Sequence, residues 1–496
     1  MPRRSNINSG KQLSALFLNA SKSRRLLLLS VGLTLAFVCG LVVVRSADLS
    51  APVILPGDQG IAPAPGMQFN PRVARGGSAS LAVWTDNRTV INGQTPGIGS
   101  PSTNPGSGSL DDIYAARLDA SGNVLDTLPI IVSEAQYNQE QPKVGWNGQN
   151  WLVAWQSQVQ NNPNYTEIRA ARVSPDGTVL DAVPLIITSP LSGNAVTPAT
   201  VISDGLNWIV MWETFNRSDG IARSVFVARV SPAGVVLDPE GKEAYKHPSQ
   251  YLDGPDLAFG GDGFLLTFVD IGAGPNFENV LKGVRLSLNL DQNGAPFNIS
   301  AGYSVGSSNT KLAFNGQYYM VVWANGFTQT TNNKLVGSRI STGGQLLDPS
   351  PIQIVANMND YAPQLDVCGD SSMWFASYES ASGPAREVRL ARVTADGAPL
   401  DANGIFVRAG DRAALTTGVG GGAQVVLHNP TFDPTYSISH VEGARASNAG
   451  TVGTIATVSL GVPRQTRPRI AQGSNGYLAV FRSESANDSR ILAQRL

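Results

Sequence analysis

One unit of sequence recurs eight times after residue 48, and this repetition restricts the possible folds more than any other feature of the chain. Six copies contain a short apolar run that ends in an aromatic residue: Trp84, Trp155, Trp212, Phe268, Trp323 and Tyr378. Two weaker copies end at His428 and Phe481. An arginine follows 14 to 17 positions later in seven copies and 33 positions later in the first, where residues 85–111 form an insertion. Repeats of this length are typical of propellers and arrays.

Each copy is predicted to form four β-strands. In the second copy they span residues 142–145, 151–155, 168–174 and 179–187, which are rich in β-branched and aromatic residues. Asn147-Gly148 forms the tight turn between the first two strands. A proline stands at the start of the first strand in most copies, where it costs no hydrogen bond of the sheet interior.

Opposite charges recur at one register position of the predicted third hairpin. If Asp176-Gly177 forms a two-residue turn, Arg172 lies directly across from Asp181. The same spacing occurs in five copies: Arg117 with Asp126, Arg172 with Asp181, Arg229 with Asp238, Arg339 with Asp348 and Arg392 with Asp401. These pairs are predicted to be structural, because a residue that recurs in every copy serves packing, whereas a catalytic residue is needed only once.

The end of the chain favours a closed ring. The last copy stops at Leu496, after its third predicted strand, while residues 48–55 (DLSAPVIL) resemble the fourth strand at residues 180–187 (LDAVPLII). We therefore expect an all-β fold, an eight-bladed β-propeller that forms a single domain over residues 46–496. In it, residues 48–55 complete the blade formed by residues 466–496 and so close the ring.

These copies resemble the tandem units of a group of bacterial exported proteins, of the form G-x-x-W-L-V-x-W … D-I-x-x-x-R-V-x-x-D-G-x-x-L-D. The second copy matches this form most closely, through Trp151, Trp155, Arg172 and Asp176-Gly177. The resemblance covers about residues 48–496. It implies a β-propeller and no particular function.

The first 45 residues point to a compartment. Residues 1–25 contain six basic and no acidic residues, and residues 26–44 form a 19-residue stretch without charge, closed by Arg45. As a helix this stretch would be about 28 Å long, enough to cross a bilayer, with residues 1–25 in the cytoplasm. We expect residues 26–45 to be a signal anchor that holds the propeller outside the cytoplasm. The alternative is a signal peptide cleaved before Ala47, which would release the propeller.

Composition excludes several classes of protein and site. The formal net charge is -1, so no basic excess attracts the chain to nucleic acid. The two cysteines and three histidines are too few and too scattered for a zinc site, and no nucleotide-binding or nucleophile motif occurs. We therefore expect no cofactor and no metal. Residues 289–294 partly match a calcium loop, but they coincide with a predicted hairpin turn.

Candidate binding residues lie in the loops that follow the second strand of each copy. In a propeller these loops share one face, and loops held by a rigid scaffold commonly carry function. The candidates on this loop-rich face are Asp86, Arg88, Glu213, Asp270 and Asn325, and no residue is assigned a catalytic role. The insertion at residues 85–111 is the largest feature of the same face.

Three functions remain open at this point. The leading expectation is a binding or adhesion module for an unidentified protein or glycan, rather than an enzyme, held to the membrane by its N-terminal helix. One alternative is a glycan-processing enzyme of glycosidase or sialidase type, with carboxylates such as Asp86, Glu213 or Asp270 converging at the channel mouth. The other is a structural component of the cell envelope. The sequence predicts no oligomeric state.

Overall fold

The computed structural model describes most of the chain after residue 63. The described residues are 64–65, 68–86, 111–135, 137–159, 166–189, 194–216, 221–246, 252–272, 279–300, 305–326, 333–360, 363–381, 386–418, 420–433, 438–459, 461–462, 464–473, 476–485 and 488–495. The chain divides into two compact units, Met1–Gly57 and Asp58–Leu496, and every described residue belongs to the second. The described ranges contain no helix that could span a membrane, and the predicted anchor at residues 26–45 lies outside them.

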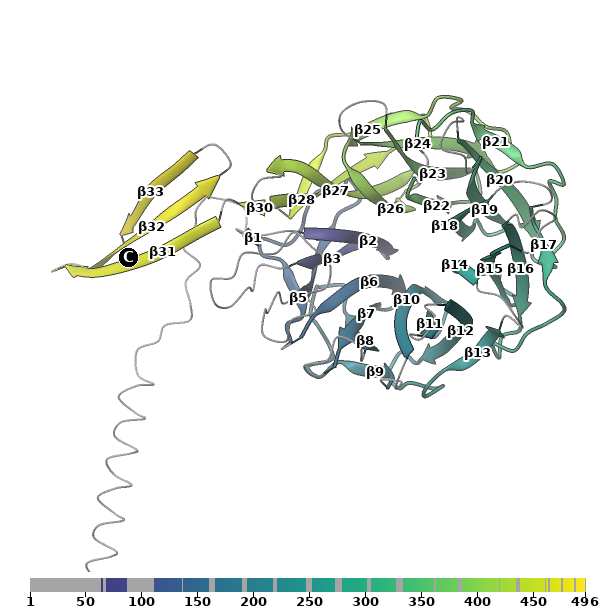
Figure 1. Cartoon of the computed structure of the whole chain (residues 1–496), viewed down its shortest axis with the longest axis horizontal. Coiled ribbons are helices and arrows are strands. Elements are labelled where there is room, and N and C mark those ends of the chain that lie inside the picture. Colours follow the sequence, from purple (N-terminus) through teal and green to yellow (C-terminus); the bar gives the residue numbers. More distant parts are fainter. Residues whose placement is uncertain are drawn as a thin grey trace, which may run out of the picture. The chain divides into compact units, whose positions relative to one another are not determined.

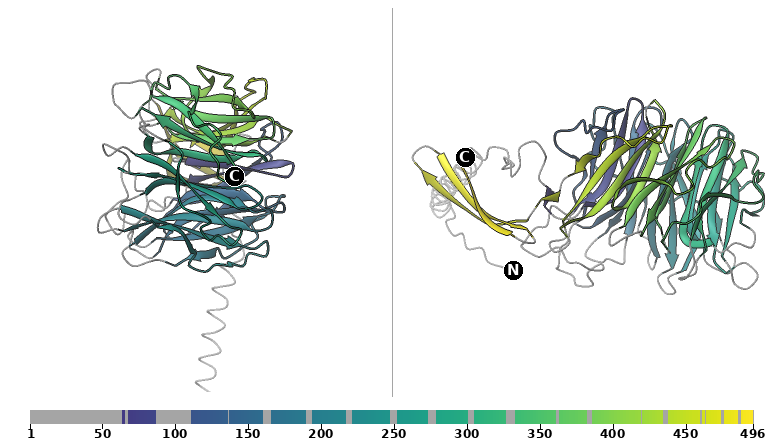
Figure 2. Two further views of the ribbon diagram at one scale, coloured as in Figure 1. Left: turned by 90° about the vertical axis from the view of Figure 1, so that its right-hand side faces the viewer. Right: turned by 90° about the horizontal axis from the view of Figure 1, so that it is seen from above.

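Seven four-stranded antiparallel sheets form a propeller ring (Figure 1). We number these blades 1 to 7 along the chain. Blade 1 contains β2 (Gln68–Gly76), β3 (Ala79–Asp86), β4 (Asp112–Leu118) and β5 (Ile130–Ser133); blade 2 contains β6 (Gln139–Trp146), β7 (Trp151–Gln158), β8 (Thr166–Val173) and β9 (Leu185–Thr188). Blade 3 contains β10 (Asn194–Ser203), β11 (Trp208–Asn216), β12 (Ile221–Val230) and β13 (Lys242–Lys246); blade 4 contains β14 (Leu252–Phe259), β15 (Phe264–Asp270), β16 (Val280–Leu286) and β17 (Phe297–Asn298). Blade 5 contains β18 (Val305–Phe314), β19 (Tyr318–Asn325), β20 (Lys334–Ser341) and β21 (Ile352–Val355); blade 6 contains β22 (Leu365–Gly369), β23 (Met373–Ser380), β24 (Glu387–Thr394) and β25 (Ile405–Ala409). Blade 7 contains β26 (Asp411–Thr417), β27 (Ala423–Asp433), β28 (Ile438–Ala446) and β29 (Ala456–Ser459). The first strand of each blade is innermost, and the strands of a blade lie side by side in both further views (Figure 2).

The eighth copy forms a separate three-stranded sheet of β31 (Arg464–Gly473), β32 (Gly476–Ser485) and β33 (Asp488–Arg495). A short parallel pair joins β1 (Ala64–Pro65) to β30 (Gly461–Val462), shortly before this sheet in the chain. The prediction of eight blades is therefore not confirmed, because the structure shows seven four-stranded blades. The predicted closing strand at residues 48–55 lies outside the described residues.

Apolar side chains between successive blades build the core. Seven buried clusters each join two neighbouring blades. The cluster that closes the ring combines Val73 and Trp84 of blade 1 with Val426 and Val441 of blade 7. Because buried side chains fill this boundary, blade 7 packs directly on blade 1, and an eighth blade would have to separate them.

The repeat aromatic lies on the second strand, three residues after the residue that pairs with the repeat arginine. In blade 2, Leu152 pairs with Arg172 and Trp155 follows three residues later. In blade 7, Gln424 pairs with Arg445, so the buried Leu427 and not His428 stands at this position. The assignment of His428 to the aromatic position is thus wrong by one residue.

An irregularity in the innermost strand decides which of its residues face the channel. One residue with a left-handed backbone, with φ between 51° and 56°, interrupts the register in four blades: Asn70, Gln141, Gly254 and Arg412. The ladder with the second strand resumes two residues later, at Arg72, Lys143, Asp256 and Ala414. In each of these four blades, the residue at which the ladder resumes therefore takes an equivalent register position beside the channel.

The five predicted arginine–aspartate pairs are all present, with N···O distances of 2.6 to 2.8 Å. The turn beside them differs from the prediction. In blade 2 it spans the five residues 174–178, with Val173 opposite Val179, rather than the two residues of a tight hairpin. The Asp181 carboxylate therefore accepts hydrogen bonds from the Arg172 backbone N–H at 2.8 Å and from its Nη2 at 2.7 Å. The Asp181 carboxylate thus accepts hydrogen bonds from both the backbone and the guanidinium group of Arg172.

Four of these five arginines also join their blade to the next. In four blades Nη1 donates to a carbonyl in the third turn of the following blade: Arg117 to Pro175 at 2.9 Å, Arg172 to Pro232 at 2.8 Å, Arg339 to Ala395 at 3.4 Å and Arg392 to Asn448 at 2.7 Å. Arg445 of blade 7 donates in the same way to Ala120 of blade 1 and so closes the ring. The turn must carry a glycine where the guanidinium lies, because a Cβ on Gly234 would approach Arg172 Cζ to 2.8 Å.

We expect Arg392→Met to destabilise the fold more than Arg445→Met. The first substitution leaves the Asp401 carboxylate, whose side chain is only 12% exposed, without its cation, at a cost of about 3 kcal/mol. Arg445 has a threonine, Thr454, at the acid position and donates to the backbone carbonyls of Gly421 and Ala120, so its loss costs about 1 kcal/mol. Urea unfolding measures both free energies.

The double variant Arg392→Met/Asp401→Asn is the matched control, because it removes the stranded charge. It should recover part of the lost free energy of unfolding. Equal losses in the two single variants, with no recovery in the double variant, would show that the pair does not stabilise the blade.

Candidate functional site

Two of the loop-face candidates are buried within blades. Asp86 in blade 1 accepts a hydrogen bond from Trp84 Nε1 at 3.0 Å, and its exposed fraction is 0%. Asp270 in blade 4 lies 2.5 Å from Lys282 Nζ and is 1% exposed. The Asp270 carboxylate therefore joins β15 to β16, whereas Asp86 binds a side chain of its own strand, β3.

The other loop-face candidates lie in different blades. Glu213 in blade 3 is half-buried, and burial together with the neighbouring Asp253 raises its pKa to about 8. Asn325 ends β19 in blade 5 and is half-buried. Arg88 lies outside the described residues. The four described candidates come from blades 1, 3, 4 and 5.

A carboxyl pair that the sequence reasoning missed joins blades 1 and 2. The side chain of Asp111, which directly precedes β4 and is 8% exposed, is hydrogen-bonded to that of Glu140 in β6. Burial, with the charge of Glu140 next, raises the pKa of Asp111 to about 8, and burial raises the pKa of Glu140 as well. Two carboxyl groups in such contact share a proton at neutral pH. Asp111 ends the insertion that the sequence analysis singled out.

We expect Asp111→Asn to change how stability depends on pH. The folded pKa of Asp111, about 8, lies above its ordinary value of 3.8, so the stability it contributes is complete below pH 4 and is lost as pH rises toward 8. The amide cannot ionise, so at pH 9 the variant should be more stable than the parent by about 2 kcal/mol, with little difference at pH 4. Denaturant unfolding at both pH values measures this.

Asp396→Asn is the control, because Asp396 lies exposed in a turn. It removes the same charge and should leave the pH dependence unchanged. A constant difference in stability between Asp111→Asn and the parent from pH 4 to 9 would contradict the shared proton.

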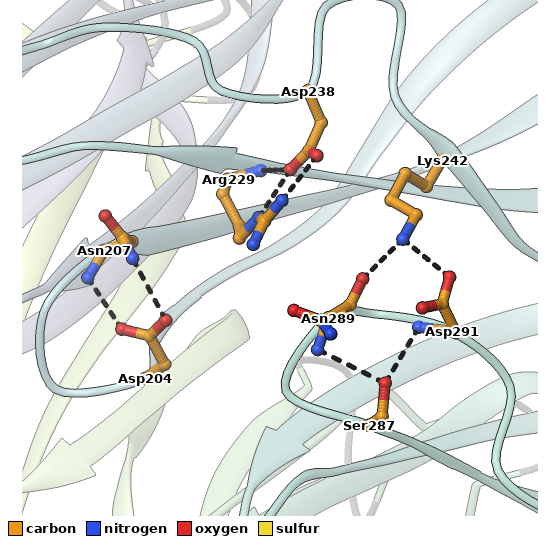
Figure 3. A network of polar contacts seen from close by, with 8 residues as sticks. All are labelled: Asp204, Asn207, Arg229, Asp238, Lys242, Ser287, Asn289 and Asp291. Carbon is orange, nitrogen blue, oxygen red and sulfur yellow. Dashed lines mark hydrogen bonds and ion pairs between the residues drawn. The ribbon is translucent and has the colours of Figure 1, made fainter.

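Lys242 binds residues 289–294, the segment that partly matches a calcium loop (Figure 3). Lys242 Nζ of blade 3 donates to the Asn289 carbonyl at 2.5 Å and lies 2.6 Å from Asp291 Oδ1. Leu290 takes the left-handed turn position, with φ 66°, and its side chain is buried. The ammonium group therefore holds the oxygens that a calcium ion would need. No three or more His, Cys, Asp or Glu side chains of the described ranges are grouped to hold a metal ion.

Seven equivalent positions on the innermost strands form a ring around the propeller axis. In blades 1 to 7 they hold Arg72, Lys143, Thr200, Asp256, Lys311, Asp366 and Ala414. Side chains two apart on a strand point to the same side. Because a Cβ on Gly145 would meet the Val201 carbonyl, the Lys143 side chain also points toward blade 3. We call this set the channel ring; five of its seven side chains are charged.

Two carboxylates of the channel ring join successive blades. Asp256 accepts hydrogen bonds from the backbone N–H of Leu257 and from that of Leu312 in blade 5, each at 3.0 Å. Asp366 accepts equivalent bonds from Val367 at 2.9 Å and from Leu415 of blade 7 at 2.7 Å. At this register the N–H groups point away from the second strand, so an acceptor in the channel must satisfy them.

Lys143 stands at the same position without a carboxylate. Its side chain makes no hydrogen bond or ion pair with the part of the chain that the structure describes. Burial lowers its pKa well below the ordinary range, and the neighbouring cations Arg72 and Lys311 lower it further. Lys311 lies 3.8 Å from Asp256 Oδ2. The carboxylates of Asp256 and Asp366 raise the pKa of Lys143 in part, so charges of both signs lie around it in the channel.

A cavity of about 540 Å³ opens where the innermost strands of blades 1, 2, 3 and 7 turn into their second strands, on the face opposite the loop-rich face. Its lining includes Val73, Arg75, Val144, Trp146, Val201, Ser203 and Thr416. The lining residues Val73 and Val144 directly follow Arg72 and Lys143 of the channel ring. This mouth therefore lies next to two basic residues of the channel ring, Arg72 and Lys143.

The sequence reasoning singled out neither Arg72 nor Lys143. A signal was present, because both directly follow the repeat proline, in Pro71-Arg72 and Pro142-Lys143, and Asp256 follows Pro255 in the same way. Charged residues at the entrance of an otherwise apolar strand could have indicated the channel.

The sequence matches no protein-family model and no curated protein sequence. Among solved structures, the propeller is similar to a puromycin-hydrolyzing peptidase of Mycobacterium tuberculosis, with 12% identity and a TM-score of 0.43 over 86% of this chain and 59% of the peptidase. It is similar to an ulvan lyase bound to a glucuronate–rhamnose-sulfate unit, with 11% identity and a TM-score of 0.47 over 80% of this chain and 96% of the lyase. It is also similar to the Trypanosoma rangeli sialidase, with 9% identity and a TM-score of 0.40 over 88% of this chain and 85% of the sialidase.

The chain thus spans less than two thirds of the length of the peptidase. At these identities and TM-scores the similarities carry no argument about the activity of this chain.

Proposed function

We propose that the protein is a binding module whose propeller captures an anionic ligand in its channel. The observation that carries this proposal is Lys143, a half-buried ammonium group without a partner among the described residues, beside a second cation, Arg72, at the edge of a cavity. Holding like charges together in a partly buried channel is unfavourable, and a bound anion relieves this cost. A protein or a glycan that carries acidic groups fits this requirement.

The full-length chain in detergent should bind trigalacturonate and a heparin disaccharide but not neutral maltotriose, as measured by calorimetry. Affinity should fall as sodium chloride is raised, because the interaction is electrostatic. Lys143→Met should weaken binding about tenfold, which corresponds to ~1.4 kcal/mol.

Lys334→Met is the matched control, because it removes an equal charge from the exposed start of β20. It should leave the affinity unchanged. Equal binding of neutral and anionic sugars, or binding of neither, would overturn the proposal.

We also propose that the propeller works outside the cytoplasm, held by residues 26–45. The basic residues 1–25 followed by 19 residues without charge support this orientation. In intact spheroplasts, added protease should degrade the propeller, whereas a tag before Met1 should survive. Protection of the propeller would exclude export, and its recovery without residues 1–46 would favour the cleaved signal peptide.

The pair of Asp111 and Glu140 gives no support to a glycan-processing enzyme. Glycosidases hold their two carboxyl groups roughly 5 to 10 Å apart. The side chains of Asp111 and Glu140 are directly hydrogen-bonded and so stand closer than this. The loop-rich face stays a second candidate surface, since most of its loops lie outside the described residues.

A further inference from the structure

We infer that the cavity binds the carboxylate of an acidic sugar between the backbone N–H groups of Val144 and Val201. There the ligand would take the place that the Asp256 and Asp366 carboxylates take elsewhere in the ring. This inference rests on the proposed function, because it names the anion and its position.

The backbone of blades 2 and 3 repeats the arrangement that binds a carboxylate in blades 4 and 5. Val144 and Val201 pair with Val153 and Val210, as Leu257 and Leu312 pair with Leu266 and Val321. All four residues therefore share one register position, at which N–H groups point into the channel. Asp256 accepts from two such groups in neighbouring blades, one with each of its oxygens. The spacing of these donors thus fits the two oxygens of a carboxylate.

In blade 2 the position equivalent to these aspartates is occupied by Lys143. Position 143 corresponds to Asp256 and Asp366, so here the protein offers a cation instead of an acceptor. No carboxylate of the described residues is bonded to the N–H of Val144 or Val201. A ligand carboxylate would accept from both N–H groups and neutralise the ammonium at once, and charge-assisted hydrogen bonds of this kind are the stronger ones.

This position is open to a ligand, whereas the other two are filled. Val73, Val144 and Val201 all line the cavity. Strands β6 and β10 approach closely here, because a Cβ on Gly145 would lie 2.6 Å from the Val201 carbonyl oxygen. The donors of the two strands can therefore reach one small group.

The walls of the cavity suit a sugar better than a peptide end. Trp146 lines the cavity, is half-buried and packs against Trp151 with ring centroids 4.9 Å apart, so its ring offers a fixed flat surface. Gly76 makes room for that ring, because a Cβ there would lie 2.5 Å from Trp146 Cε3. Ser203 and Thr416 add hydroxyl groups to the lining. An aromatic platform with a few polar groups is the usual form of a small-molecule site.

The test compares ligands and variants on the full-length chain by calorimetry. The probes are trigalacturonate, its neutral methyl ester, a sulfated disaccharide without carboxylate, and a tripeptide with a free or an amidated C-terminus. Lys143→Asp should place a carboxylate against Val144 and Val201 as Asp256 does, so it should abolish trigalacturonate binding and keep or raise the melting temperature. Thr200→Asp, which places a carboxylate beside Val201, is the second blocking variant should the first fail to fold.

Lys311→Met is the matched control, since it removes one charge from the same channel ring in blade 5, which contributes no residue to the cavity lining. It should weaken trigalacturonate binding less than threefold, against about tenfold for Lys143→Met. Trigalacturonate should bind and its methyl ester should not.

Several outcomes would overturn the inference and leave anion binding in place: tighter binding of the sulfated disaccharide, equal effects of Lys143→Met and Lys311→Met, or undiminished binding to a folded Lys143→Asp. Tighter binding of the tripeptide with a free C-terminus than of trigalacturonate would overturn the assignment of a sugar as the ligand. If no anionic probe binds, the proposed function itself is contradicted.

Discussion

Five of the seven blades are joined to the next through one side chain, the arginine near the end of the third strand. In blade 2 the Asp181 carboxylate holds Arg172 in place, and the guanidinium then reaches a carbonyl of blade 3. The planar guanidinium can serve both partners at once, which an ammonium group does less well. The third turn of the neighbouring blade has to carry a glycine beside it. One ion pair thus explains why arginine, aspartate and glycine recur together in the repeat.

The same contact closes the ring. Arg445 has no aspartate, yet it reaches the Ala120 carbonyl of blade 1, and an apolar cluster fills the boundary beneath it. In blade 3, where Leu290 occupies the glycine position of the next turn, Lys242 makes the connection instead. The connection from blade 3 to blade 4 is therefore kept, although a different residue makes it.

The channel follows from a second requirement of the backbone. Innermost strands have no neighbour on the channel side, so their N–H groups need acceptors there. Asp256 and Asp366 are such acceptors for two pairs of blades. Because the repeat constrains the arginine and the core but not the channel ring, the ring differs from blade to blade and becomes asymmetric. The part of the ring with Arg72 and Lys143 lies next to the cavity. A binding position can therefore exist at one place in the ring, although the scaffold repeats in every blade.

Much of the scaffold could be predicted from the sequence, since spacing alone identified the five ion pairs and the four strands of the second copy. The fourth of these strands was predicted at residues 179–187 but spans only Leu185–Thr188. The turn beside Arg172 was misjudged, because Asp-Gly in sequence is compatible with a two-residue and with a five-residue turn. The site was not predicted. Asp86 and Asp270 were chosen for their charge, but both are buried within blades, whereas Lys143 looked like one charged residue in an ordinary strand.

The sequence by itself determined the blade, because strand patterning, the repeat arginine and the turn glycine are local and act over a few dozen residues. Only the tertiary structure decided how many blades close the ring and which residues meet in the channel. Both depend on contacts between residues hundreds of positions apart, such as Arg445 with Ala120. Eight copies in the sequence are compatible with a ring of seven, because closure is decided by whether buried side chains of the first and last blades fit together, and no repeat count contains that information.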